Sequence, residues 1–98
     1  MKARKLVVRR VVLSESSFAE IVVWHVPEAV SGSMHLFKYR LAYVVNGNCV
    51  LRFDNEAGKG DHLHVSGTEK PYRFSSPRQL LADFFEEIAR WNDEHIDD

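Results

Sequence analysis

The chain has little cysteine and no long apolar run, so its sequence is typical of one small globular domain. Its 98 residues include a single cysteine, Cys49, so no disulfide can form within the chain, and this composition is typical of a reducing cytoplasm. No stretch approaches the roughly 20 apolar residues that a membrane helix needs. The apolar run at residues 6–8 stops at Arg9 and Arg10, which argues against a signal peptide. We therefore expect one cytoplasmic domain over residues 1–98, with Cys49 as a small strand residue.

Neither sign of charge dominates the chain, but its two halves differ. The formal net charge is −1, yet residues 1–49 carry seven Lys and Arg against three Asp and Glu, while residues 50–98 carry six against eleven. A basic first half can contact a polyanion, or it can complement the acidic second half within the fold. With 45% hydrophobic residues, the chain is expected to fold rather than remain disordered.

Short β-branched and alternating segments predict an antiparallel meander. Pro27 ends the second of these segments, because proline has no amide hydrogen to give to a strand ladder. Asn46-Gly47 between two such segments predicts a hairpin, since a type I′ turn needs positive φ at both positions. A further turn is expected over residues 67–71. The predicted strands cover residues 5–13, 18–26, 35–45, 49–53 and, as a short resumption, 62–65.

One helix is expected at the end of the chain. Ser76 can cap it, Pro77 suits the first helical position, and Gln79 stands where a capping box places it. Apolar residues then recur at helical spacing and predict a stripe that packs on the core: Leu81, Phe84, Phe85, Ile88 and Trp91. The predicted fold class is therefore α+β, an antiparallel β-meander of four to five strands with one C-terminal helix packed on a face.

The segment from residue 54 to 64 holds the residues that are best suited to chemistry. Gly58 and Gly60 flank Lys59, and such a turn can point backbone amides at an anion while the lysine adds charge. His62 and His64 are two residues apart, so on a strand both rings project from the same face. Three carboxylates lie close by in sequence: Asp54, Glu56 and Asp61.

Two chemistries use such a combination. In the first, one histidine takes the proton of a ribose 2′-hydroxyl, a second protonates the leaving oxygen, and the lysine stabilises the phosphorane. In the second, the two histidines and a carboxylate bind a divalent metal that activates water. The candidates for the third ligand are Asp61, Asp54, His35 and His25. Alternatively, the glycines simply form a turn and the histidines lie on an exposed strand.

A second pair of basic residues precedes the hairpin. Lys38 and Arg40 share one face of the predicted strand over residues 35–45, where they can bind phosphate or simply face solvent. The first strand carries Lys5, Arg9 and Arg10, which can protect an edge of the sheet by charge. Alternatively, an unprotected edge can pair two copies of the chain as a homodimer.

These residues together resemble a family, the TumE-type toxins of bacterial toxin–antitoxin systems. The resemblance rests on the stretch over residues 38–44, on Asn46-Gly47, and most specifically on residues 54–64 with the pattern Gly-Lys-Gly-Asp-His-x-His. It also includes residues 24–27 and 80–84. The resemblance implies a small cytoplasmic toxin that is neutralised in a direct complex with a helix-turn-helix-type antitoxin encoded beside it.

The family resemblance implies a toxin–antitoxin system but no particular reaction, so we infer the reaction from the residues themselves. We expect a small, metal-independent ribonuclease that needs no cofactor, with RNA as its substrate. His62 and His64 are its predicted acid/base pair, Lys59 its electrostatic stabiliser, and Asp54 or Asp61 the residue that orients an imidazole. Four further residues are predicted to bind substrate: Gly58, Gly60, Lys38 and Arg40. The alternative is a non-enzymatic module that binds an anion or a protein and forms a complex with the antitoxin.

Overall fold

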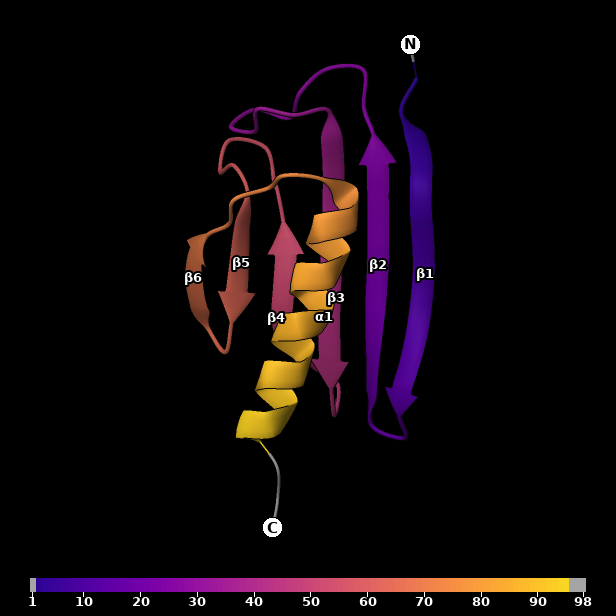
Figure 1. Cartoon of the computed structure of the whole chain (residues 1–98), viewed down its shortest axis with the longest axis vertical. Coiled ribbons are helices and arrows are strands. Elements are labelled where there is room, and N and C mark those ends of the chain that lie inside the picture. The colour runs from indigo at the N-terminus through magenta and orange to yellow at the C-terminus, as the bar shows by residue number, and fades with distance from the viewer. Residues whose placement is uncertain (1, 96–98) are drawn as a thin grey trace.

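Six antiparallel strands in sequence order form one sheet in this computed structural model, which describes residues 2–95 (Figure 1). The strands are β1 (Arg4–Ser14), β2 (Ser17–His25), β3 (Phe37–Val45), β4 (Asn48–Asp54), β5 (His62–Val65) and β6 (Thr68–Pro71). The helix α1 (Pro77–Glu94) lies across one face of the sheet, mainly over β3 and β4. The predicted α+β class with a C-terminal helix on one face is therefore confirmed, whereas the predicted four to five strands were too few.

The additional strand is β6, where the sequence predicted a turn over residues 67–71. The chain reverses earlier, at Ser66 and Gly67, which both have positive φ (48° and 84°). Residues 68–71 then pair with β5 as the edge strand of the sheet. Pro71 is compatible with this position because it ends an edge strand, where a missing amide hydrogen costs little.

Two local signals of the sequence are confirmed. Asn46 and Gly47 have φ values of 51° and 80°, as a type I′ hairpin turn requires, and they join β3 to β4. Ser76 caps α1 by accepting a hydrogen bond from the amide of Gln79 at 3.1 Å, and Pro77 begins the helix. The Gln79 side chain, however, does not complete a capping box, because its amide donates to Asp83 instead.

The core lies between α1 and the face of the sheet that the helix covers. Strand residues alternate between the two faces, so the core residues of β2 to β5 occupy every second position. The helix is rotated slightly from the predicted stripe: Leu80 is fully buried, while Phe85 is 39% exposed. The central core residues are Ala19, Ile21, Val23, Tyr39, Leu41, Tyr43, Leu51, Phe53, Leu63, Leu80, Phe84 and Ile88.

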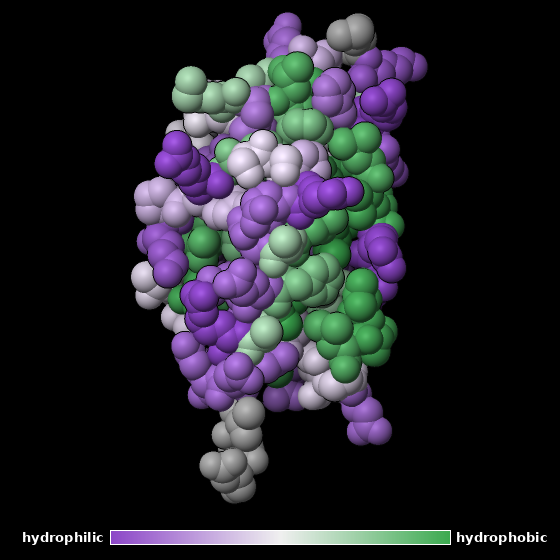
Figure 2. Space-filling model, in the orientation of Figure 1, coloured by the Kyte–Doolittle hydropathy of each residue, from purple (hydrophilic) through white to green (hydrophobic). Residues whose placement is uncertain are grey.

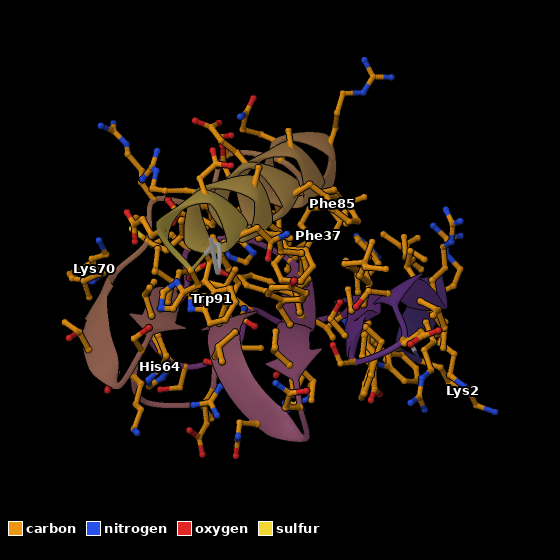
Figure 3. The ribbon with its side chains drawn as sticks, turned by 90° about the horizontal axis from the view of Figure 1, so that it is seen from below. Lys2, Phe37, His64, Lys70, Phe85 and Trp91 are labelled. Carbon is orange, nitrogen blue, oxygen red and sulfur yellow. The ribbon has the colours of Figure 1, made fainter. Side chains whose placement is uncertain are left out.

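The opposite face of the sheet has no helix over it within residues 2–95, and we call it the open face. Figure 3 shows His64 on this side, away from α1, while Trp91 lies between the helix and the sheet. Cys49 is exposed in β4. Over residues 2–95, no helix is both long enough and apolar enough to span a membrane.

Candidate functional site

Strand pairing aligns the polar residues of the open face in two rows. Arg40 of β3 stands opposite Asp54 of β4, which stands opposite His62 of β5. In the next row, Arg52 of β4 stands opposite His64 of β5. Residues directly opposite one another on neighbouring strands point to the same face. The register therefore brings an arginine, an aspartate and two histidines together on one side of the sheet.

His62 is the buried member of this group. Its side chain is only 4% exposed, its Nδ1 donates a hydrogen bond to the Gly60 carbonyl at 2.9 Å, and its Nε2 lies 2.5 Å from Asp54 Oδ1. Each ring nitrogen therefore faces an oxygen, and neither presents a lone pair to solvent. Buried polar groups with such partners hold a fixed orientation. The predicted pairing of Asp54 with an imidazole is present, and it involves His62.

Asp54 is held between an arginine and a histidine. Its Oδ2 lies 3.0 Å from Arg52 Nε, and its Oδ1 faces His62. Both contacts are short, but neither has the alignment of a directed hydrogen bond, so Arg52 Nε, Asp54 Oδ1 and His62 Nε2 are buried atoms without one. We therefore describe the trio as a buried polar cluster that is held by close contacts and not by aligned hydrogen bonds. Buried clusters of this kind are costly to assemble and are frequent at functional sites.

His64 is the accessible histidine of the pair. It is half-buried, and its ring lies edge-on to that of His62 with the centroids 4.9 Å apart. Its Nε2 accepts a hydrogen bond from Arg52 Nη2 at 2.9 Å, so the ring is neutral in this contact and carries its proton on Nδ1. Arg52 thus joins His64 to Asp54 and links the two rows of the open face.

A cavity of about 320 Å³ lies beside this cluster on the open face. Three basic side chains line it, Lys38, Arg40 and Arg52, together with the carboxylates of Asp54 and Glu56. Lys38 stands opposite Trp24 of β2, and Lys5 of β1 lies over the Trp24 ring at 5.3 Å from its centroid. The cluster of Asp54, His62, His64 and Arg52 therefore borders a hollow with enough cationic groups to hold a phosphate.

Asp61 belongs to a different cluster. Its carboxylate accepts three hydrogen bonds, from Ser33 Oγ (2.5 Å), His35 Nε2 (2.7 Å) and the Tyr39 hydroxyl (2.7 Å). His35 is fixed further, because its Nδ1 accepts the Phe37 amide at 3.1 Å and its ring stacks on Phe74. Asp61 therefore orients His35, and the structure does not bring it to His62 or His64.

This second cluster also changes the ionisation of a tyrosine. Burial, followed by the hydrogen bond to Asp61 and the charge of that carboxylate, raises the pKa of Tyr39 well above its ordinary value. Asn55, which is 1% exposed, completes the network: its amide group accepts from the Tyr39 backbone and donates to the Phe37 carbonyl and Ser33 Oγ. These contacts join the connection between β2 and β3 to the connection between β4 and β5.

The two glycines around Lys59 serve the same junction. Gly60 has a φ of 74°, and a Cβ atom there would lie 2.9 Å from the Gly32 carbonyl oxygen. The Gly58 amide donates to the Ser31 carbonyl at 2.7 Å, so it is not free to bind an anion. Lys59 itself lies 3.8 Å from Glu56 and lines a cavity with His35, Asp61 and Phe74. The predicted grouping of Lys59 with the two histidines is therefore absent from the contacts of the described residues.

The metal alternative has a definite geometry here. One ligand atom each from Asp54, His62 and His64 lies within 4.8 Å of the others, so Asp54 is the candidate third ligand. His35 and Asp61 contact each other elsewhere, and His25 packs its ring against Phe37 at 5.5 Å. Arg52, however, contacts Asp54 and His64, two of the three candidate ligands. A guanidinium at that position opposes a second cation by charge repulsion.

Several residues of these clusters were missed from the sequence. Arg52 was detectable, since it is two residues before Asp54 in a strand and therefore shares its face. Tyr39, Asn55 and Ser33 were not, because their partners are between 16 and 28 residues away along the chain.

The fold and the two clusters describe a small α+β protein with a cationic hollow on the open side of its sheet. The family model described as Toxin TumE matches residues 2–92 of the 98-residue chain. The chain belongs to the TumE toxin family, and it is therefore the toxin of a toxin–antitoxin system. The curated proteins and the solved structures contain no significant match to it.

Proposed function

We propose that this toxin is a metal-independent ribonuclease whose active site lies on the open face of the sheet. The observation that carries the proposal is the contact between His64 and Arg52 at the border of the hollow lined by Lys38 and Arg40. An imidazole beside an arginine supplies a base and a phosphate-stabilising cation. Both groups are needed to cleave RNA through attack by its own 2′-hydroxyl.

Each residue has a distinct role in this reaction. Lys38 and Arg40 bind the phosphates that flank the cleaved bond, while the Arg52 guanidinium turns from His64 to the reacting phosphate. This movement frees His64 Nε2, which takes the proton of the ribose 2′-hydroxyl. The 2′-oxygen attacks phosphorus, the bond to the 5′-oxygen breaks, and that oxygen takes a proton from water. The resulting hydroxide takes the proton back from His64, which leaves a 2′,3′-cyclic phosphate and a 5′-hydroxyl.

The proposal revises the roles that the sequence suggested. His62 is buried, so we assign it with Asp54 to position Arg52 and His64 and not to touch the substrate. Arg52 replaces Lys59 as the electrostatic stabiliser, because it is the cation that contacts His64. Asp61, Gly58 and Gly60 shape the loop that leads into β5 at His62. We further propose that the toxin acts in the cytoplasm as a single domain and is bound by a helix-turn-helix-type antitoxin.

The test is cleavage of a defined single-stranded RNA by purified toxin, with product ends identified. We expect a 2′,3′-cyclic phosphate product, activity that is retained with EDTA, and a loss of about 10²- to 10⁴-fold in His64→Ala, the usual contribution of a general base. His95→Ala is the matched control, since His95 is exposed at the end of α1.

Three other results of this experiment would favour a different function or contradict the proposal. Activity that disappears with EDTA and returns with Zn²⁺ would assign the cluster to a metal. RNA binding without any cleavage would favour the non-enzymatic module, because Lys38, Arg40 and Arg52 can hold a polyanion without reacting with it. Full activity in His64→Ala would contradict the proposal outright.

A further inference from the structure

One edge of the sheet is unusually long and apolar. β1 has eleven residues, pairs with β2 on one side only, and ends the sheet within the described part of the chain. The other edge strand, β6, has four residues and ends in Pro71. Natural sheets usually protect their edges by short strands or proline, as at β6. β1 lacks both devices and is protected by charge instead, because it carries four cationic side chains. This charge disfavours a cationic strand but leaves the outward-facing backbone groups of β1 available to an acidic one.

Apolar side chains accompany this free edge. Of the seven exposed large hydrophobic residues in the described chain, four belong to β1 and a fifth, Phe85 of α1, lines a groove beside it. Val8 and Val12 stand opposite Val22 and Phe18 of β2 and therefore share the open face. Leu6 and Phe85 line the groove on the helix side, so apolar side chains lie on both faces of this edge. Figure 2 shows hydrophobic side chains gathered along the side of the molecule where β1 and β2 lie. The five residues are Leu6, Val8, Val12, Leu13 and, on α1, Phe85.

The positive charge of β1 indicates which kind of strand can pair with this edge. The strand carries Arg4, Lys5, Arg9 and Arg10 and no acidic residue. If β1 of a second copy paired with it, the four cations of one copy would lie along the same edge as the four of the other, and like charges across strands are destabilising. An acidic segment would instead meet complementary charge along the whole edge. A second copy of the toxin is therefore a poor partner for this edge.

We propose that β1 is the docking edge for the antitoxin, which adds an extended acidic segment to the sheet as a seventh strand. Strand addition uses backbone hydrogen bonds for affinity and alternate side chains for specificity. In such a segment, the residues opposite Val8 and Val12 are apolar, and the residues opposite Arg9 and Arg10 are acidic. This surface is separate from the hollow at Lys38 and Arg40, so the proposal is independent of the ribonuclease proposal.

The first experiment measures binding of the purified antitoxin encoded beside the toxin. Val8 and Val12 are 58% and 73% exposed, so Val8→Lys/Val12→Lys can remove apolar contacts with little effect on folding, which is checked by thermal unfolding. We expect the dissociation constant to rise about a hundredfold or more. Met34→Lys is the matched control, because Met34 is fully exposed and far from β1 in the sequence, and we expect it to bind as wild type does. Wild-type affinity in the double variant would overturn the proposal.

The second experiment separates an added strand from a helix lying beside α1. A groove between β1 and α1, lined by Leu6, Val11, Leu81 and Phe85 among others, is the position for such a helix. Hydrogen exchange measured by NMR should show new protection at alternate amides of β1 in the complex. Unchanged exchange along β1, with binding lost in Phe85→Lys, would overturn the strand proposal. So would a toxin homodimer that Val8→Lys/Val12→Lys separates, because the edge would then belong to a second copy.

Discussion

The contact between Gly60 and Gly32 allows a stability prediction in which one glycine controls for another. Gly58 and Gly60 both have positive φ, 85° and 74°, so alanine at either position is placed in the left-handed region. That strain costs about 1–2 kcal/mol, of which up to about 1 kcal/mol is offset because alanine reduces the entropy of the unfolded chain. We expect Gly58→Ala, whose Cβ meets nothing within 4 Å, to lose about 1 kcal/mol.

Gly60→Ala carries the same strain and a steric cost in addition. Its Cβ would lie 2.9 Å from the Gly32 carbonyl oxygen, an atom of the backbone that cannot rotate away. The two loops must separate, and overpacking of this kind typically costs a further 1–3 kcal/mol or so. The free energy of unfolding of Gly60→Ala should therefore fall by about 3 kcal/mol, roughly 2 kcal/mol more than in Gly58→Ala.

Urea denaturation of both variants against wild type measures this difference directly, provided that the m-values agree. Equal losses in the two variants would refute the reasoning, because the loop contact would then contribute nothing. The same pair tests the anion-binding interpretation of the Gly58-Lys59-Gly60 turn. Gly58→Ala should retain RNA cleavage, since its amide already donates to Ser31.

Three further predictions concern ionisation, metal and substrate binding. Burial raises the pKa of both Tyr39 and Tyr72, so the folded state keeps these two protons above pH 10 while the unfolded state loses them. Each tyrosine should therefore lower stability there by up to about 1.4 kcal/mol per pH unit. Tyr39→Phe should remove the Tyr39 share of this slope in urea titrations at about pH 10–11, and an unchanged slope would contradict the assignment. Arg52→Ala should bind Zn²⁺ more tightly than wild type in a competition assay with a zinc indicator, because two candidate ligands lose their guanidinium; equal affinities would contradict the role given to Arg52. Lys38→Ala/Arg40→Ala should weaken RNA binding and reduce its salt dependence, and an unchanged salt slope would exclude both from phosphate contact.

The sequence predicted correctly those features that depend only on neighbouring residues, namely the hairpin turn and the helix cap. The Asn46-Gly47 hairpin and the Ser76 cap depend on backbone conformations that those residues favour wherever they occur. β6 was missed because Gly67 and Pro71 lie within five residues, and glycine and proline also mark turns. The pairing that turns Thr68–Pro71 into a strand depends on β5 and is invisible within the segment itself.

For the candidate site, strand alternation predicted which residues share a face of the sheet, but neither their burial nor their distant partners. Period-two alternation correctly placed His62 beside His64, and the hairpin register adds Asp54 opposite His62. Alternation could not show that His62 is buried, since its exposure depends on side chains from neighbouring strands. It also could not separate Asp61 from the histidines, because Asp61 is bound by Ser33 and His35, residues nearly thirty positions earlier.

The most direct test of the central claim is the cleavage of a defined RNA by Arg52→Lys and Arg52→Ala toxins in EDTA, compared with wild type. Loss of one preorganised cation at the reacting phosphate typically costs about 10²- to 10³-fold in rate. We predict that loss in Arg52→Ala with partial recovery in Arg52→Lys, because lysine retains the charge but not the planar guanidinium that contacts both Asp54 and His64. Cleavage by Arg52→Ala at the wild-type rate would contradict an active site on the open face.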